Sequence, residues 1–219
     1  FGYQWTKDQQ HAYFTIRSQE DVDKQVPLKS YLWKVGDPVD QAKFIGTTKD
    51  AKDSYFIYDN RYSDVTFYGE GNFNVNNCRI RKTGTTDEGV LIYDSKEFSA
   101  YPSAIGNKLY ILTNDHAPNY RFMVASKEKP SYKDWQVLIP EGATVIENVE
   151  VLRDGRLIVQ DKKDIQSRLT LRDATGKLIK AIELPEIGNV DYVNFDREED
   201  SVYIYMRTFT SPGKMYVAS

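Results

Sequence analysis

Few residues of this chain have the type and spacing that covalent catalysis requires. His11 and His116 are the only histidines, and they stand far apart in the sequence. His116 lies in an Asn-Asp-His-Ala-Pro segment and could act as a base, although such a residue more often shapes a turn. No Gly-x-Ser-x-Gly sequence occurs, so the strained turn that presents a nucleophilic serine in α/β-hydrolases is missing. We therefore expect no catalytic residue in this chain.

Metal and cofactor motifs are equally sparse. Cys78 is the only cysteine, and one cysteine with two scattered histidines cannot complete a tetrahedral zinc site. The acidic run from Asp196 to Asp200 offers oxygen ligands but lacks the glycine spacing of a calcium loop, so a solvated turn is favoured. Gly69-Glu70-Gly71 is too short for a dinucleotide loop. We expect neither a metal nor a cofactor.

Carboxylates at predicted strand ends suggest one further chemistry. They are Asp53, Asp59, Asp64 and Asp191. Propeller glycosidases use acidic residues that face a central funnel, because glycoside cleavage needs two carboxylates at a set separation. The sequence does not fix that separation, and charged turn residues are the favoured interpretation.

Composition narrows the class of protein. The 219 residues include 16 tyrosines, 10 phenylalanines, 13 glycines and 8 prolines, with a net charge of −3 and no run of apolar residues long enough to span a membrane. These values predict a soluble, turn-rich chain that binds neither nucleic acid nor a membrane. The lone cysteine excludes an internal disulfide but leaves cytoplasm and periplasm both open. The start at Phe1, without an apolar leader, suggests a processed or excised segment.

A repeated unit organises these residues. Short apolar runs recur about every 46 residues, at 12–16, 65–68, 109–112, 157–159 and 202–206. A short strand and a turn precede each run, a third strand follows it, and a fourth follows in four cases. This pattern predicts an all-β chain of β-propeller blades, with about five four-stranded antiparallel blades of which the last is incomplete. The expected blades of this single domain are 1–48, 49–97, 98–143, 144–187 and 188–219.

The missing fourth strand leaves two interpretations open. The chain resembles a cut segment of a larger propeller, because no N-terminal strand is left over to complete the last blade. Alternatively, it forms a closed five-bladed ring whose last blade has three strands. In an open ring, Tyr3, Trp5, Tyr203 and Tyr205 would expose apolar surface and unpaired edges, and the fragment would self-associate or close with fewer blades.

Several segments resemble the later blades of the prolyl oligopeptidase propeller. They are LYILTNDHAPNYRFMVAS at 109–126, DWQVLIPE at 134–141, the Asp-Gly-Arg turn at 154–156, ATGKLIKAIELPEIGNV at 174–190 and TFTSPGKMY at 208–216. YQWTKDQQHAYF at 3–14 and the segment Ser30–Gly36 are similar to an earlier blade, though less specifically. The resemblance covers nearly the whole chain.

That resemblance implies a function. In this family a seven-bladed propeller caps an α/β-hydrolase domain that holds the serine, aspartate and histidine, and it admits short peptides while excluding folded proteins. The chain would then be a non-catalytic segment of a serine endopeptidase that cleaves after proline. Its implied partners are the α/β-hydrolase catalytic domain of the same parent chain and short peptide substrates.

The resemblance also implies a substrate-proximal rim. Family positions that approach the substrate pocket fall on Ala51, Lys52 and Asp53 and on Gly71, Asn72 and Phe73. The family has a cysteine where this chain has Asn72, which sets this rim apart from the family pattern. Two alternatives remain: the propeller of an oligopeptidase B-like enzyme that cuts after arginine or lysine, and a free-standing propeller that binds a protein or glycan.

Overall fold

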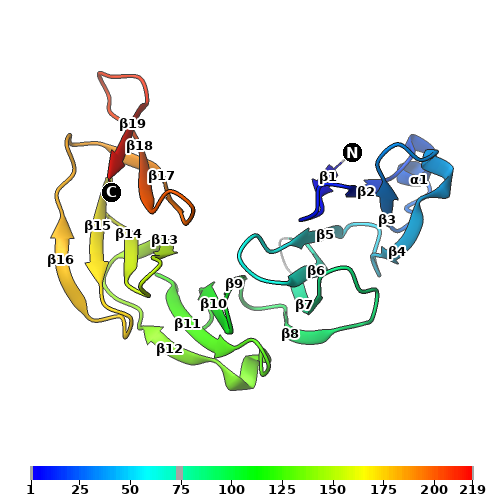
Figure 1. Cartoon of the computed structure of the whole chain (residues 1–219), viewed down its shortest axis with the longest axis horizontal. Coiled ribbons are helices and arrows are strands. Elements are labelled where there is room, and N and C mark those ends of the chain that lie inside the picture. Colours follow the sequence, from blue (N-terminus) through cyan, green and yellow to red (C-terminus); the bar gives the residue numbers. More distant parts are fainter. Residues whose placement is uncertain (1, 73–75, 219) are drawn as a thin grey trace. The chain divides into compact units, whose positions relative to one another are not determined.

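The fold was analysed in a computed structural model, which describes residues 2–72 and 76–218. In these residues the chain is almost entirely β-structure, with one short α-helix, α1 (Gln19–Asp23), and two 3-10 turns, η1 (Val39–Gln41) and η2 (Tyr132–Asp134) (Figure 1). The strands are β1 (Gly2–Trp5), β2 (His11–Ile16), β3 (Lys29–Lys34), β4 (Lys43–Thr47), β5 (Ser54–Asp59), β6 (Val65–Gly71), β7 (Asn76–Lys82), β8 (Val90–Ser95), β9 (Ala100–Ile105), β10 (Lys108–Thr113), β11 (Arg121–Ser126), β12 (Gln136–Ile139), β13 (Val145–Val151), β14 (Leu157–Lys163), β15 (Gln166–Arg172), β16 (Leu178–Ile182), β17 (Asn189–Asp196), β18 (Ser201–Arg207) and β19 (Lys214–Ala218).

The strands form five sheets, and within each sheet every strand is hydrogen bonded to the next one along the chain. The first four sheets have the orders β1-β2-β3-β4, β5-β6-β7-β8, β9-β10-β11-β12 and β13-β14-β15-β16, and the fifth is β17-β18-β19. Sequential four-stranded antiparallel sheets are the blades of a propeller. The predicted fold class, including a last blade of three strands, is therefore confirmed.

Consecutive apolar side chains are buried along β10. In β10, Leu109, Tyr110 and Ile111 are consecutive and all buried, although successive side chains in a strand point to opposite faces. Both faces of this strand are therefore covered, as the apolar sequence predicts.

Contacts divide the chain into two compact units. The first is Phe1–Tyr110 with Ala125–Trp135, and the second is Ile111–Val124 with Gln136–Ser219. The N-terminal unit has an aromatic cluster in which Trp135 packs edge-on against Tyr93, with ring centroids 6.1 Å apart. The C-terminal unit has an aliphatic core from its last two sheets, which includes Leu169, Val193 and Ile204. The expectation of a single domain with the stated blade boundaries stays a prediction.

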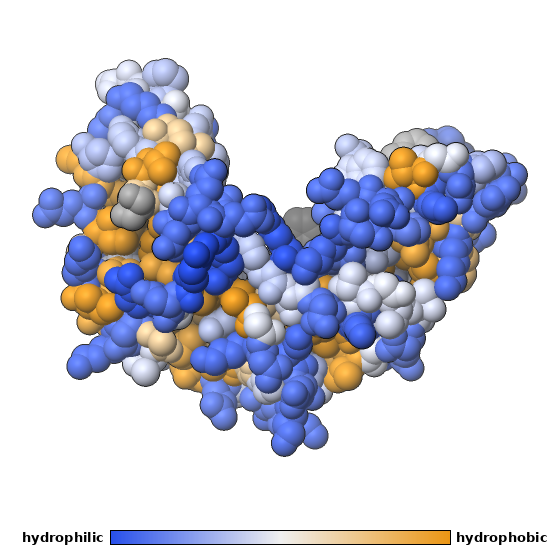
Figure 2. All heavy atoms as spheres, viewed as in Figure 1, coloured by the Kyte–Doolittle hydropathy of each residue, from blue (hydrophilic) through white to orange (hydrophobic). Residues whose placement is uncertain are grey.

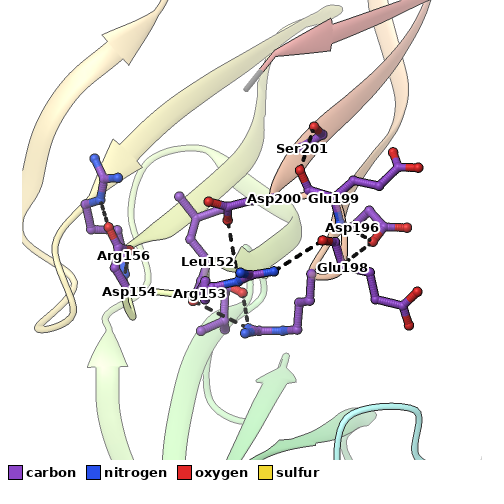
Figure 3. A network of polar contacts seen from close by, with 11 residues as sticks. Leu152, Arg153, Asp154, Arg156, Asp196, Glu198, Glu199, Asp200 and Ser201 are labelled. Atoms are coloured by element: carbon purple, nitrogen blue, oxygen red, sulfur yellow. Dashed lines mark hydrogen bonds and ion pairs between the residues drawn. The ribbon is translucent and has the colours of Figure 1, made fainter.

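Neighbouring sheets within each unit are joined at the turn between their first and second strands. In the N-terminal unit, the backbone amide of Lys7 donates to the Asp59 carboxylate at 2.9 Å. In the C-terminal unit, Arg197 donates to the carbonyl of Val151, and Arg153 lies 3.8 Å from the Asp200 carboxylate (Figure 3). In both units, this end of a sheet therefore carries a link to the next sheet.

The helix and the surface complete the description. Ser18 caps α1 with a reciprocal capping box, in which its hydroxyl accepts from the Asp21 amide at 3.0 Å.

Across residues 2–72 and 76–218, no helix has the length and apolar character needed to cross a bilayer. Hydrophobic patches are visible on the side of Figure 2 where Figure 1 places β16, whose residues Leu178 and Ile179 are exposed.

Candidate functional site

The antiparallel register of β5 and β6 brings most of the predicted rim residues together. Ser54, the first residue of β5, pairs with Gly71, the last residue of β6. The residues just before β5 therefore lie beside those just after β6. The Asn72 side-chain amide donates a hydrogen bond to the Asp53 carboxylate across this gap. Phe73 lies outside the described residues.

A tight turn positions the first half of the rim. The Asp50 carboxylate accepts from the Lys52 amide at 2.8 Å, and its carbonyl accepts from the Asp53 amide at 3.2 Å. This is the Asx-turn geometry that aspartate favours in loops. The side chain of Lys52 is exposed and that of Ala51 is half-buried. The turn thus presents one cation and one carboxylate at the start of β5.

An aromatic cleft of about 630 Å³ opens beside this rim. It is lined by Ser54, Phe56, Tyr58, Gly71, Asn72, Asn76, Tyr93, Ser99, Ala100, Tyr101 and Pro102. Two hydrogen bonds hold its walls: the Tyr58 hydroxyl donates to the Pro102 carbonyl at 3.2 Å, and the Asn76 amide donates to the Phe98 carbonyl at 3.0 Å. Its size and its lining, which combines four aromatic side chains with a few polar groups, are those of a ligand-binding cleft.

Tyr58 and Tyr93 in the cleft, and Cys78 beneath it, are neutral at physiological pH. Burial raises the pKa of Tyr58 and of Tyr93 well above the usual tyrosine value. Cys78 is 0% exposed, and burial also raises the pKa of its thiol. A neutral, inaccessible thiol is a poor nucleophile. The cleft can therefore bind an apolar or aromatic group and hydrogen bond to it, without covalent chemistry from these residues.

The histidine and the acidic run occupy turns. His116 has a side chain that is 81% exposed, and its Nε2 lies 3.7 Å from Asp115, which is itself paired with Arg121 at 2.7 Å. The run from Asp196 to Asp200 spans the end of β17 and the turn before β18, and Figure 3 shows its contacts. The Asp196 carboxylate there accepts backbone amides, at 2.7 Å in the shorter bond. Both segments serve local structure.

The strand-end carboxylates do not form a glycosidase pair on β5. Asp53 precedes this strand and Asp59 ends it, so a rise of about 3.3 Å per residue puts their backbones about 20 Å apart. Glycosidases need about 5–10 Å between their carboxyl groups. Asp64 is paired with Lys127 at 2.9 Å, and Asp191 accepts from Arg207 at 2.9 Å. Each of the four carboxylates has a structural partner.

Sequence reasoning missed the aromatic walls of the cleft. Ser54, Phe56 and Tyr58 alternate along β5 and therefore share one face. That spacing was visible in the sequence. Tyr93 and Tyr101 come from the end of β8 and the start of β9, and only the packing of two neighbouring sheets brings them to the same cleft.

Comparison with known proteins gives a consistent result. The family model described as the prolyl oligopeptidase, N-terminal beta-propeller domain, matches residues 1–219. A prolyl endopeptidase of Elizabethkingia meningoseptica is 27% identical over 112 residues, which are 51% of this chain and 16% of that protein. A prolyl endopeptidase of Elizabethkingia miricola is 25% identical over 115 residues, again 51% of this chain and 16% of that protein.

Solved structures share the fold at low sequence identity. One, from a structural and mechanistic analysis of two prolyl endopeptidases, has a TM-score of 0.86 at 18% identity and covers 100% of this chain and 33% of its own. Prolyl oligopeptidase B from Galerina marginata, bound to a 35mer substrate, has a TM-score of 0.81 at 14% identity, covering 99% of this chain and 31% of its own. This chain thus spans about a third of the solved chains and a smaller part of the curated relatives.

Proposed function

Because the chain belongs to the prolyl oligopeptidase N-terminal β-propeller family, we propose that it is the non-catalytic propeller segment of a serine endopeptidase that cleaves short peptides after proline. In this role it controls which peptides reach a catalytic domain carried elsewhere in the parent chain. Its partners are then that α/β-hydrolase domain and the peptide substrates themselves.

One observation carries the proposal. The rim residues Asp53 and Asn72 meet where β5 begins and β6 ends, directly beside the aromatic cleft that Asn72 also lines. Amide and carboxylate groups hydrogen bond to a peptide backbone, and aromatic walls accept apolar or proline side chains. This combination suits an extended peptide and supplies no nucleophile. The bond-breaking groups must therefore come from another part of the parent.

The rim can be tested in the parent peptidase. Asn72→Ala removes one hydrogen-bonding side chain at the rim, and we expect kcat/KM for a short Gly-Pro substrate to fall by several-fold. Asn107→Ala is the matched control, because Asn107 is exposed in the turn between β9 and β10, at the opposite end of its blade. Equal kcat/KM for both variants and the unmodified parent would contradict a substrate role for the rim.

Two further measurements address the alternatives. The 219-residue chain should not hydrolyse a chromogenic Gly-Pro substrate above background, and turnover would overturn the non-catalytic role. A parallel assay of the parent with a Gly-Arg substrate separates cleavage after proline from cleavage after arginine. The names of the curated relatives favour proline.

Self-association of the segment belongs to the same proposal. Tyr3 and Trp5 on β1 are exposed, as expected for an edge that a neighbouring blade covers. Sedimentation at several concentrations should therefore show a concentration-dependent mass, and a constant monomer mass would argue against uncovered apolar edges.

A further inference from the structure

Two β-bulges place acidic side chains in one cavity of the C-terminal unit. The register of β13 with β14 shifts around Glu147, and the register of β17 with β18 shifts around Asp191, so each is the extra residue of its bulge. A bulge redirects the side chain that it carries. Both side chains line the same cavity of about 570 Å³, whose lining residues come from β13, β14, β17 and β18.

A buried glutamine forms one wall of this cavity. Gln160 is 4% exposed, and its Nε2 donates to Glu147 Oε2 at 3.0 Å and to the Val190 carbonyl at 2.8 Å. Both partners are acceptors, which fixes the orientation of the amide, because the reversed amide would place oxygen against oxygen. Gln160 Oε1 then has no hydrogen-bond partner among residues 2–72 and 76–218. A buried acceptor left in this way is destabilising unless a donor reaches it.

The two carboxylates differ in how well they are paired. The guanidinium of Arg207 binds Asp191 through two nitrogens, at 2.9 Å for Nη2. Apart from the hydrogen bond that its Oε2 accepts from Gln160, Glu147 has the ammonium of Lys162 at 3.7 Å from Oε1, which is too long for a hydrogen bond. The cavity wall therefore presents one acceptor whose demand for donors is incompletely met, Oε1 of Glu147, and a second unmet acceptor, Oε1 of Gln160, is buried behind that wall.

An aromatic ring adds to this acceptor-rich surface. Tyr192 lines the cavity, is partly exposed, and stacks on Tyr205 with ring centroids 5.4 Å apart. Aromatic faces attract cations, and a carboxylate beside such a face strengthens the preference. A ligand that carries a positive charge with hydrogen-bond donors complements both the Glu147 carboxylate and the Tyr192 ring.

We propose that this cavity binds a guanidinium or primary ammonium group carried on a peptide, with Glu147 as the acceptor, held in place by Gln160, and Tyr192 beside the cation. The choice of a peptide as the carrier rests on the proposed function, whereas the choice of a cation rests on the cavity alone. Lys162 is the internal competitor, because its ammonium is the cation nearest to Glu147.

Binding can be measured on the 219-residue chain by calorimetry or NMR titration. The probe is acetyl-Gly-Arg-Gly-amide, and the matched neutral probe replaces arginine with citrulline, which keeps the shape and removes the charge. We expect saturable binding of the arginine peptide and at least tenfold weaker binding of the citrulline peptide. Triglycine amide, whose only cation is its terminal ammonium, tests whether a peptide N-terminus serves as well as a side chain.

Three variants assign the site. Glu147→Gln should weaken binding of the arginine peptide at least tenfold, whereas Glu183→Gln, at an exposed position outside the cavity, should leave it unchanged. Lys162→Gln should strengthen binding several-fold, because it removes the competing cation. If the cavity instead bound an anion through Lys162 and Arg207, the same Lys162 variant would weaken binding.

The results separate this inference from the proposed function. Equal binding of the arginine and citrulline peptides, weaker binding by Lys162→Gln, or no saturable binding would each overturn the cation site. If Glu147→Gln does not fold, the citrulline and Lys162 comparisons still decide. None of these measurements involves peptidase activity, so their failure leaves the rim test with Asn72→Ala unaffected.

Discussion

Asp59 links the first two sheets of the N-terminal unit, and replacing it with asparagine should loosen that link. Its carboxylate ends β5 and accepts three hydrogen bonds, from the Lys7 amide at 2.9 Å, the Tyr13 hydroxyl at 3.0 Å and the Thr66 hydroxyl at 2.5 Å. Lys7 and Tyr13 belong to the first sheet region, whereas Thr66 lies on β6 of the same sheet as Asp59. The Asp59→Asn substitution would keep the size of the side chain and remove its charge and one acceptor oxygen.

The expected magnitude follows from the three donors. Hydrogen bonds to a charged acceptor contribute about 1.5–3 kcal/mol each, and those between neutral groups about 0.5–1.5 kcal/mol. Both hydroxyls can rotate toward another acceptor, but the amide hydrogen of Lys7 is fixed by its backbone. The NH₂ group of the introduced asparagine must also face at least one of these donors. We expect Asp59→Asn to lower the free energy of unfolding by about 2–4 kcal/mol.

Denaturant unfolding followed by circular dichroism measures this loss. Asp164→Asn is the control, because Asp164 is an exposed turn residue with a φ of 57°, a conformation that asparagine also tolerates, and it should change stability by less than about 0.5 kcal/mol. Tyr13→Phe should cost about 1 kcal/mol in the unmodified chain and almost nothing beside Asp59→Asn. Additive effects of these two substitutions, or a loss below about 0.5 kcal/mol for Asp59→Asn, would refute the reasoning.

Three further predictions concern other buried groups. Burial raises the pKa of Tyr13 and Tyr55 to about 12, above the unfolded value of 10.0, so their contribution to stability is complete below pH 10 and should be lost as pH rises from 10 to 12. Absorbance titration checks this: we expect these two tyrosines, together with Tyr58 and Tyr93, to ionise only on unfolding, and normal titration of every tyrosine would contradict it. Cys78 should not react with a thiol reagent until the chain unfolds, and stoichiometric labelling of the folded chain would contradict its burial. Gly69→Ala should destabilise by about 1–3 kcal/mol, because its Cβ would lie 2.1 Å from a backbone oxygen of the neighbouring strand. Gly142→Ala, with open space around it, should be near neutral, and similar melting temperatures for both variants would contradict the packing argument.

The strands were predictable because their signal is local. The apolar runs between turn residues predicted the second strand of each blade, at 12–16, 65–68, 109–112, 157–159 and 202–206, and each run lies within the observed strand. The short helix α1 was missed, since five residues do not establish a helical period. Its capping box, Ser18 with Asp21, was the one sequence signal that would have indicated it.

The functional residues were harder to predict because they depend on register and on the packing of separate sheets. The family resemblance placed Asp53 and Asn72 near a common rim, and the β5–β6 register explains why they meet. The bulges at Glu147 and Asp191 had no such signal. In the β17 sequence NVDYVNFD, an uninterrupted alternation fits as well as a bulged one, so which face Asp191 occupies is decided by pairing with β18.

In the blades described above, the two ends carry different features. The turn between the first and second strands carries the links between sheets, through Asp59 in one unit and Arg197 in the other. The opposite end, where the first strand begins and the second ends, carries the rim at Asn72 in one unit and the cation cavity at Glu147 in the other. Asp59 accepts three hydrogen bonds, whereas Gln160, which also donates to the Val190 carbonyl of the next sheet, retains an unmet acceptor. Substitutions at the first end should therefore change stability before binding, and substitutions at the second should change binding before stability.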